Sequence, residues 1–387
     1  MKIFYVCYED ISGHNGAVRH IIEIVVNLQK LGHKIQLCVP GVARYKGEMP
    51  LDIKYIPIVN LPFLRPLSYI LFALFFLVLY LLRFKPDVVY LREMLFGTTQ
   101  QVIISRWLKY PSVVEVNGAL AEQKKRLNIF SLLIKFMQRK SFNLVDKIIV
   151  HSSGLAWEIE KEYKIQSSRI VVIRMGVDIE RFKPIPRQET RKRLKLADDF
   201  YYVGFTGSLL PWQGIDNLID SAPLIIREIP RVRFLIVGGG RLRGSLVRRA
   251  VRAGCRDNFI FTGEVEFESV PLYINSFDIG VAFFKPVRSD PGDPIKLYEY
   301  LACGIPVVAS NVKGYGDVVE GVGAGRGVDS LNPLAVSRII IDLLRDEDLR
   351  SNMAQAAGPY SVKDSTWLVR ARETEVYLRQ IQHKDKE

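Results

Sequence analysis

A lysine and a glutamate stand three residues apart in a short, well-bounded helical pattern. The pattern lies in DPGDPIKLYEYLACGIPVVAS, residues 290–310, where Asp293 has the side chain of an N-cap and Pro294 fits the first helical position. Lys296 then falls in the first turn, where the helix dipole disfavours a cation, and a bound anion would reverse that effect. Glu299 shares its face, so both side chains could serve one ligand. A surface ion pair between the two is the alternative.

Glycine-bearing segments that follow predicted strands offer further anion sites. Residues 13–16 and 207–214 each precede a predicted helix, whose free N–H groups could hold a phosphate. Residues 238–240 form a third such turn. Its spacing to Gly244 does not produce GxGxxG, so the fingerprint of a nicotinamide or flavin cofactor is absent.

A repeated strand, loop, helix and strand unit must position these segments. Strands that alternate with helices predict parallel sheets with helices on both faces, and two restarts predict two sheets. Ligands of such sheets bind beyond the carboxyl ends of the strands, where the glycine segments fall. The predicted elements are strands at 2–8 and 34–39 around a helix at 17–31, and strands at 202–206 and 232–237 around a helix at 215–227.

Length and composition agree with two folded domains. The chain has 387 residues, of which 48% are hydrophobic and 25% charged, and a length of this order exceeds that of one ordinary core. The four cysteines are scattered without a CxxC pair, which predicts reduced core thiols rather than disulfides or a zinc site. The N-terminus lacks the long apolar core of a secretory signal.

The net charge of +13 calls for an anionic partner. Nucleic acid, a membrane and a phosphorylated substrate all satisfy charge alone. A run of arginines at residues 241–256 has neither aromatic interleaving nor zinc-ligand spacing, so we interpret most of it as a solvated helix face and expect no nucleic-acid partner.

Two further stretches favour a membrane. Residues 67–82 are almost wholly apolar, with Arg65, Arg83 and Lys85 at their ends, and are shorter than the roughly 20 residues that span a bilayer. Residues 122–140 mix lysines and arginines with apolar side chains. A basic amphipathic segment beside a very apolar one predicts shallow contact with an anionic membrane. A fully buried helix at 67–82 is the alternative.

Taken together, these motifs resemble a known family. KLYEYLACGIPVVAS (296–310) is similar to the E-x-M-A-C-G-x-P-V-V-A-S helix of retaining, nucleotide-sugar-dependent glycosyltransferases of family four, also called group 1. RIVVIRMGVDIERFKP (169–184) resembles their I-x-V-I-P-N-G-V-D-x-x-x-F-x-P hinge, and FTGEV (261–265), NGAVRH (15–20) and Trp367 resemble weaker signatures. The family includes bacterial lipopolysaccharide and mannosyl transferases.

The resemblance implies the α/β fold called GT-B, with two Rossmann-like, doubly wound parallel-sheet domains facing a cleft. It implies an N-terminal acceptor and membrane-facing domain at 1–180, and a donor domain at 181–362. A C-terminal helix at 363–387 would cross back to the N-terminal domain.

The resemblance also implies roles for particular residues. Lys296 would neutralise the leaving diphosphate, Glu299 would accept hydrogen bonds from the ribose hydroxyls, and backbone groups around Gly263 and Val265 would flank the base. The implied donor-binding set is Gly16, Ser208, Gln213, Arg241, Gly263, Val265, Asp293, Lys296, Leu297 and Glu299. The implied catalytic set is Lys296, Asn117 and Glu122.

Some positions depart from the family pattern. Pro291 stands where a glutamate usually holds the donor sugar, Ser208 and Gln213 replace a basic pair, and Asn117 takes the place of a histidine. Nearby, we expect His20 to pack under the glycine loop and Glu115 to lie at the surface.

The sequence thus predicts a membrane-associated retaining hexosyltransferase of lipopolysaccharide or other polysaccharide biosynthesis. Its substrates would be a nucleoside diphosphate sugar and a lipid-linked or cell-surface glycan acceptor. We expect no cofactor and no metal, because no carboxylate pair has cation-ligand spacing, and a cytoplasmic location on the inner face of the membrane. The alternatives are a catalytically degenerate nucleotide-sugar-binding protein and a sugar-nucleotide epimerase on the same fold.

Overall fold

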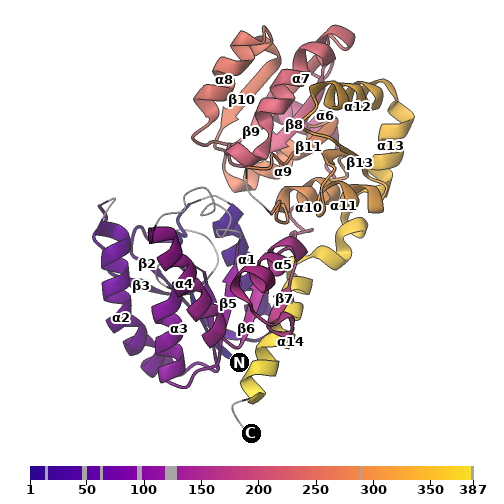
Figure 1. Ribbon diagram of the computed structural model, residues 1–387. Helices are drawn as coiled ribbons and strands as arrows, with labels where there is room; N and C mark the ends of the chain where they lie inside the picture. Colours follow the sequence, from indigo (N-terminus) through magenta and orange to yellow (C-terminus); the bar gives the residue numbers. More distant parts are fainter. Residues whose placement is uncertain are drawn as a thin grey trace. The chain divides into compact units, whose positions relative to one another are not determined.

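The computed structural model describes residues 1–13, 16–45, 50–61, 64–93, 98–117, 129–287 and 290–384. The chain forms two compact units (Figure 1). The first contains Met1–Met175 and Trp367–Glu387, and the second contains Gly176–Thr366. The chain therefore leaves the first unit after Met175 and re-enters it at Trp367.

The first unit is built on a parallel seven-stranded sheet. Its strands are rich in Val, Ile and Leu and most are buried on both faces, as in other parallel sheets covered by helices. The strand order is β3 (Asp52–Ile56), β2 (Lys34–Pro40), β1 (Lys2–Val6), β4 (Val88–Arg92), β5 (Ser112–Val116), β6 (Lys147–Val150) and β7 (Ile170–Val172).

Helices cover both faces of this sheet. Alternate residues of β1 show the division, because Phe4 and Val6 belong to one hydrophobic core, whereas Ile3 and Tyr5 belong to the other. The first core is closed by α2 (Leu64–Phe84), α3 (Thr98–Trp107), α4 (Ile129–Leu144) and α5 (Ser153–Tyr163). The second core is closed by α1 (Gly16–Lys30) and α14 (Trp367–Lys384).

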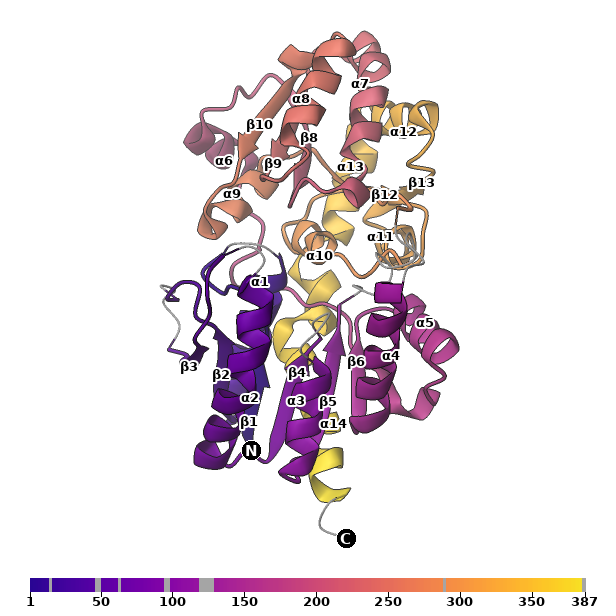
Figure 2. The same cartoon turned by 60° about the vertical axis from the view of Figure 1, so that its left-hand side comes forward.

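Helix α14 packs on α1 although more than 300 residues separate them. Ala371, Leu378 and Ile381 lie at a helical spacing and are buried in the same core as Ile21 and Val25 of α1. Figure 2 shows α14, in yellow, against the strands of the first sheet. The last helix of the chain is thus part of the first unit.

The second unit has a parallel six-stranded sheet. The strand order is β10 (Phe259–Gly263), β9 (Val232–Val237), β8 (Tyr201–Thr206), β11 (Ile279–Ala282), β12 (Val307–Ser310) and β13 (Gly325–Val328). Helices α7 (Ile215–Glu228), α8 (Arg243–Arg252), α12 (Pro333–Arg345) and α13 (Glu347–Ala356) close one core. The remaining helices are α6 (Arg187–Leu194), α9 (Val270–Asn275), α10 (Ile295–Ala302) and α11 (Gly316–Gly321).

Glycines let α10 and the segment after α9 approach the central strands closely. A Cβ on Gly204 of β8 would lie 2.2 Å from the ring of Phe277, and one on Gly280 of β11 would lie 2.8 Å from Tyr300. The described residues also form short 3-10 helices: η2 (Ser167–Arg169), η3 (Pro211–Gln213), η4 (Arg256–Asn258), η5 (Phe267–Ser269) and η6 (Pro359–Ser365).

The two predicted strand, loop, helix and strand units are confirmed, with boundaries that differ by one or two residues. The predicted helix at 67–82 is longer than its apolar run, because α2 begins at Leu64 and ends at Phe84. The prediction of two all-parallel sheets with helices on both faces is also confirmed.

Candidate functional site

Three glycine loops meet at the carboxyl end of the second sheet. The N–H of Gly207, after β8, donates to the carbonyl of Val237 over 3.0 Å, and the N–H of Gly238 donates to Gly263 over 2.9 Å. A Cβ on Gly238, whose φ is +136°, would lie 2.1 Å from the carbonyl oxygen of Gly207. Only glycine fits there, so these loops present backbone rather than side chains.

The helix that carries Lys296 begins one residue later than predicted. Pro294 is the N-cap residue of α10, with extended backbone and no side-chain cap hydrogen bond, and the helix starts at Ile295. The prediction that Asp293 caps the helix is therefore wrong. The Asp293 carboxylate is turned to Tyr298 instead, whose phenol donates to it over 2.8 Å. Lys296 is the second residue of the helix, close to its positive end.

The Lys296 ammonium lies against the glycine loop after β8. Its Nζ donates to Oε1 of Gln213 over 2.6 Å and lies 4.0 Å from the centre of the Phe205 ring. A Cβ on Gly207 would approach Nζ to 3.2 Å. Because Gln213 directly precedes the Gly214 cap of α7, the lysine joins the beginnings of two helices. Both helix ends favour a negative charge, so a bound anion would complete the arrangement.

The other residues of the implied donor site fall into three groups. Glu299 is buried to 9% exposure one turn along α10 from Lys296, whereas Leu297 is wholly buried and contributes packing to the core. Ser208 and Val265 are half-buried in the loops after β8 and β10. Arg241 is exposed after the third glycine loop. The contact between Lys296 and Gln213 directly links two predicted residues of this unit.

Glu115 is the centre of a dense polar cluster in the first unit, and the prediction that it lies at the surface is wrong. Its side chain is fully buried. Its Oε1 accepts from Nδ2 of Asn117 over 2.8 Å and lies 3.1 Å from Nη1 of Arg92. Its Oε2 accepts from the phenols of Tyr90 over 2.7 Å and Tyr5 over 3.4 Å. The carboxylate is thus satisfied by a cation and three neutral donors.

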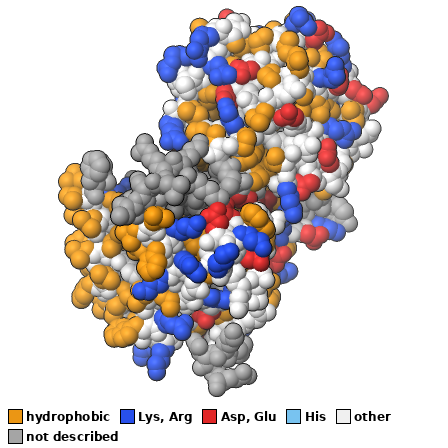
Figure 3. All heavy atoms as spheres, viewed as in Figure 1, with side chains coloured by type: hydrophobic (Ala, Val, Ile, Leu, Met, Phe, Trp, Pro, Cys, Tyr) orange, Lys and Arg blue, Asp and Glu red, His pale blue; other side chains and the backbone are white. Residues whose placement is uncertain are grey.

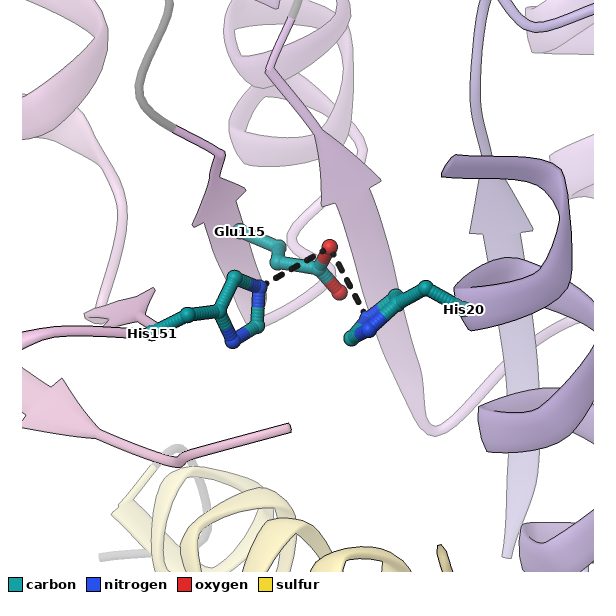
Figure 4. A group of neighbouring side chains, drawn as sticks. All are labelled: His20, Glu115 and His151. Atoms are coloured by element: carbon teal, nitrogen blue, oxygen red, sulfur yellow. Dashed lines mark ion pairs between the residues drawn. The ribbon is translucent and has the colours of Figure 1, made fainter. Parts of the chain in front are cut away.

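Two buried imidazoles face the same carboxylate (Figure 4). Nε2 of His20 lies 3.2 Å and Nε2 of His151 lies 3.4 Å from Oε1 of Glu115. The Nδ1 of His151 is 2.8 Å from the carbonyl oxygen of Ile173, which can only accept, so this nitrogen carries the proton. His20, which the sequence predicts to pack under the glycine loop, is buried, with 3% exposure.

The parallel sheet explains why these residues meet. Arg92 ends β4, Glu115 is the fourth residue of β5, and His151 follows β6 directly. These strands are neighbours in the sheet, so their carboxyl ends lie side by side. His20 reaches the same edge from the first turns of α1. One feature of the sequence could have predicted this cluster, namely the charged residues at the ends of three apolar strands.

The cluster is charge-balanced around an ionised Glu115. Burial alone raises the pKa of this carboxyl, but His20, Arg92 and His151 together hold its pKa well below the usual value. Burial lowers the pKa of His20 to about 4, against the opposing effect of Glu115. A neutral His20 beside a paired Glu115 and Arg92 is therefore the state expected near neutral pH.

His20, Glu115 and His151 also have the ligand types of a metal site. Their ligand atoms lie within 4.8 Å of one another, and two imidazoles with a carboxylate suit several divalent metals. However, Oε1 of Glu115 already accepts from Asn117 and lies beside Arg92. A divalent ion would bury a second cation next to that guanidinium, which is costly. We therefore interpret the cluster as a protein network.

Asn117 and Gly16 lie at the same end of the sheet. Asn117 follows β5 and is half-buried, and among the described residues its Oδ1 is a buried acceptor without a hydrogen-bond partner. Gly16 is the exposed first residue of α1. Glu122, the third predicted catalytic residue, lies outside the described residues.

Glu93 is a further candidate functional residue, which the sequence did not indicate. It follows Arg92 at the end of β4, and one of its oxygens accepts from Gln138, which in turn accepts from the phenol of Tyr163. Its other oxygen is buried without a partner among the described residues. Burial raises the pKa of this carboxyl to about 7, so it would change charge near neutral pH.

Comparison with known proteins gives the chain a family. The family model described as Glycosyltransferase Family 4 matches residues 14–181, and the one described as Glycosyl transferases group 1 matches residues 186–358. Together these two matches take in most of both units.

Curated relatives are similar over part of the chain. A GDP-mannose-dependent alpha-(1-6)-phosphatidylinositol monomannoside mannosyltransferase of Mycobacterium tuberculosis is 31% identical over 212 residues, which are 53% of this chain and 54% of the relative. A D-inositol 3-phosphate glycosyltransferase of Streptomyces coelicolor is 27% identical over 61% of this chain and 56% of the relative. The chain thus spans about half the length of the curated relatives it matches.

A solved structure is similar over nearly the whole chain. The Anabaena protein HepE in complex with UDP superposes with a TM-score of 0.78 at 19% identity, covering 98% of this chain and 100% of that one. This likeness shows the fold, which is GT-B with two Rossmann-like parallel-sheet domains. With both family models matched in the order that the resemblance implies, the chain belongs to glycosyltransferase family 4.

Proposed function

We propose that this protein is a retaining hexosyltransferase, which moves a sugar from a nucleoside diphosphate donor to a lipid-linked or cell-surface glycan acceptor. The observation that carries the proposal is the Lys296 ammonium, held by Gln213 against the glycine loop after β8. A fixed cation at the beginnings of two helices suits a diphosphate and not a neutral sugar.

The residues around this ammonium suggest how transfer would proceed. Lys296 and the exposed N–H groups of the loops would stabilise the charge that develops on the leaving diphosphate. Glu299 would accept hydrogen bonds from the ribose hydroxyls, and backbone around Gly263 and Val265 would flank the base. The leaving phosphate would take the acceptor's proton through an oxocarbenium-like transition state. This route retains the configuration and assigns the charge neutralisation to Lys296 rather than to a metal.

The first unit would supply the acceptor side. The Oδ1 of Asn117, which has no hydrogen-bond partner among the described residues, is an acceptor for a sugar hydroxyl, and Glu122 remains a sequence-based candidate for a catalytic role toward the glycan. The names of the mannosyltransferase relatives include a phosphatidylinositol acceptor, which supports a lipid-linked substrate. A lipid-linked acceptor would place the protein at the inner face of the cell membrane, consistent with the net charge of +13.

The test is release of nucleoside diphosphate from a panel of UDP-, GDP- and ADP-sugars, with and without membranes that carry polyprenyl-linked glycans. Release from one donor, only with those membranes, is the expected result and fixes the donor. Nucleotide binding without release from any donor would show instead a degenerate binding protein, as the departures at Pro291, Ser208 and Gln213 allow. Conversion of the donor to an isomeric sugar nucleotide without acceptor would show an epimerase.

A further inference from the structure

We propose that the first unit docks on an anionic membrane through the outer face of α2, α3 and α4, with α2 lying in the plane of the membrane surface. We call this the docking face and define it by Leu67, Leu71, Phe75, Leu82, Trp107 and Phe136. The inference gives the proposed transferase a defined membrane contact. It rests on the proposed function only for the identity of the lipid-linked acceptor.

Helix α2 carries two apolar faces. Tyr69, Ala73 and Leu77 recur at every fourth residue and are wholly buried against the sheet. On the opposite side, Leu71 is 63% and Phe75 is 66% exposed. The outer face of a helix on a soluble protein is ordinarily polar, so this outer face requires an apolar environment of its own.

The neighbouring helices extend the exposed apolar face. Helix α3 packs against α2 on one side and α4 on the other. Trp107 at the end of α3 is 73% exposed, and Phe136 of α4 is 65% exposed. In Figure 3 the hydrophobic side chains gather over this side of the first unit. A contiguous apolar patch of this kind marks an interaction surface rather than scattered surface residues.

The charges of the three helices indicate which kind of partner binds the docking face. The sequences of α2, α3 and α4 contain no aspartate or glutamate, and their charged residues are all lysine or arginine. Arg83, Arg139 and Lys140 are exposed. A second copy of this chain would bring two such basic faces together, which opposes association. Anionic headgroups with acyl chains beneath them match both the cations and the apolar side chains.

The packing of α2 decides that it lies on the bilayer and does not cross it. The helix is long and apolar enough to span a membrane by its length and composition, yet its inner face is buried inside the protein. Tyr69 and Leu77 belong to the core between helix and sheet, and a spanning position would strip that core from β1 and β4. An in-plane helix keeps its inner contacts and buries its outer face in lipid.

Flotation with lipid vesicles tests the docking face. The full chain is mixed with vesicles of phosphatidylcholine containing phosphatidylglycerol, and with vesicles of phosphatidylcholine alone. We expect binding to the anionic vesicles and at least a tenfold loss in the double variant L71E/F75E. The matched control is L334E, because Leu334 of α12 is 68% exposed in the second unit, and we expect it to bind like the unaltered chain. Equal binding by L71E/F75E and the unaltered chain would overturn the proposal.

A fluorescent label reports the orientation and does not depend on how the acidic variant folds. Environment-sensitive probes on L67C and L82C, near the two ends of α2, should both brighten with anionic vesicles and show equal depth to lipid-phase quenchers. Placement of the two ends in opposite leaflets would show a spanning helix and refute the in-plane arrangement. A dimer in solution that L71E/F75E dissociates, without vesicle binding by either form, would assign the face to self-association.

The proposed docking face and the proposed transferase activity can be tested independently of each other. Vesicle flotation uses no donor, whereas diphosphate release can be measured with acceptor dissolved in detergent. We expect L71E/F75E to keep its turnover in detergent and to lose it on acceptor in vesicles. Vesicle binding without turnover on any donor would refute the proposed function and leave the docking face intact.

Discussion

The carboxamide of Asn117 donates from Nδ2 to Oε1 of Glu115 over 2.8 Å. This contact fixes which end of the amide faces away from the cluster, because the donor end is held by a buried carboxylate. The acceptor end, Oδ1, is the one left without a partner among the described residues. The Asn117 carboxamide is thus held by neighbours that the sequence alone did not connect to it.

Removing the charge of Glu115 should destabilise the first unit. In Glu115→Gln the amide oxygen can still accept from Asn117, but Arg92 loses its buried countercharge. Stranding one partner of a buried ion pair costs about 3–5 kcal/mol. Urea denaturation should show a loss of this size, with Glu189→Gln, an exposed residue of α6, as the control. A midpoint unchanged from that of the unaltered chain would show that the pair contributes little.

Glu93 should make stability fall as the pH rises from about 4.5 to about 7. Its pKa is about 7 in the folded protein and 4.5 for an unperturbed carboxyl, so between these values the unfolded chain releases a proton that the folded chain keeps. Glu93→Gln cannot ionise and can still accept from Gln138. It should be more stable than the unaltered chain by about 1–3 kcal/mol at pH 8 and equal to it near pH 4. The opposite pH dependence would mean that Glu93 is ionised in the folded protein.

Metal removal should leave transfer unchanged. The ligand atoms of His20, Glu115 and His151 are close together, but Arg92 already neutralises the carboxylate. Treatment with EDTA, followed by elemental analysis and the diphosphate-release assay, should show no loss of turnover and no stoichiometric metal in the untreated protein. One zinc or iron per chain, lost together with thermal stability in His20→Ala, would instead establish a metal centre.

Lys296→Ala should remove turnover while the fold persists. Loss of a single group that stabilises transition-state charge lowers kcat by about 10²–10³-fold, and Lys296 is only half-buried, so the core is undisturbed. Single-turnover kinetics and circular dichroism separate the two effects. Full activity in this variant would reject the site around the glycine loop after β8.

Glu299→Ala should weaken donor binding more than it slows the chemical step. A carboxylate that accepts from ribose hydroxyls contributes about 1.5–3 kcal/mol, which corresponds to a roughly 10- to 150-fold rise in Kd by calorimetry. Glu347→Ala, at an exposed position of α13, serves as the control. Unaltered affinity for the nucleoside diphosphate would place Glu299 outside the donor site.

The sequence by itself determined the two parallel sheets and the candidate donor helix. The alternation of apolar strands with amphipathic helices has its own periods, and the glycine loops and the lysine pattern at 296–310 are local in the chain. Their structures depend on neighbours within a few residues, so pattern and propensity suffice. The start of α10 was the exception, because Asp293 is drawn to Tyr298 and leaves Pro294 as the cap residue.

Only the tertiary structure decided which residues surround Glu115 and that the outer face of α2 is exposed. Arg92, Glu115 and His151 come from three strands that become neighbours through sheet order, and the sequence of β5 alone did not show that its carboxylate is buried among them. Equally, the sequence of the 21 residues of α2 does not reveal which faces of this helix the rest of the protein covers. Burial depends on which elements pack against a residue, and that is a property of the assembled chain rather than of any segment of it.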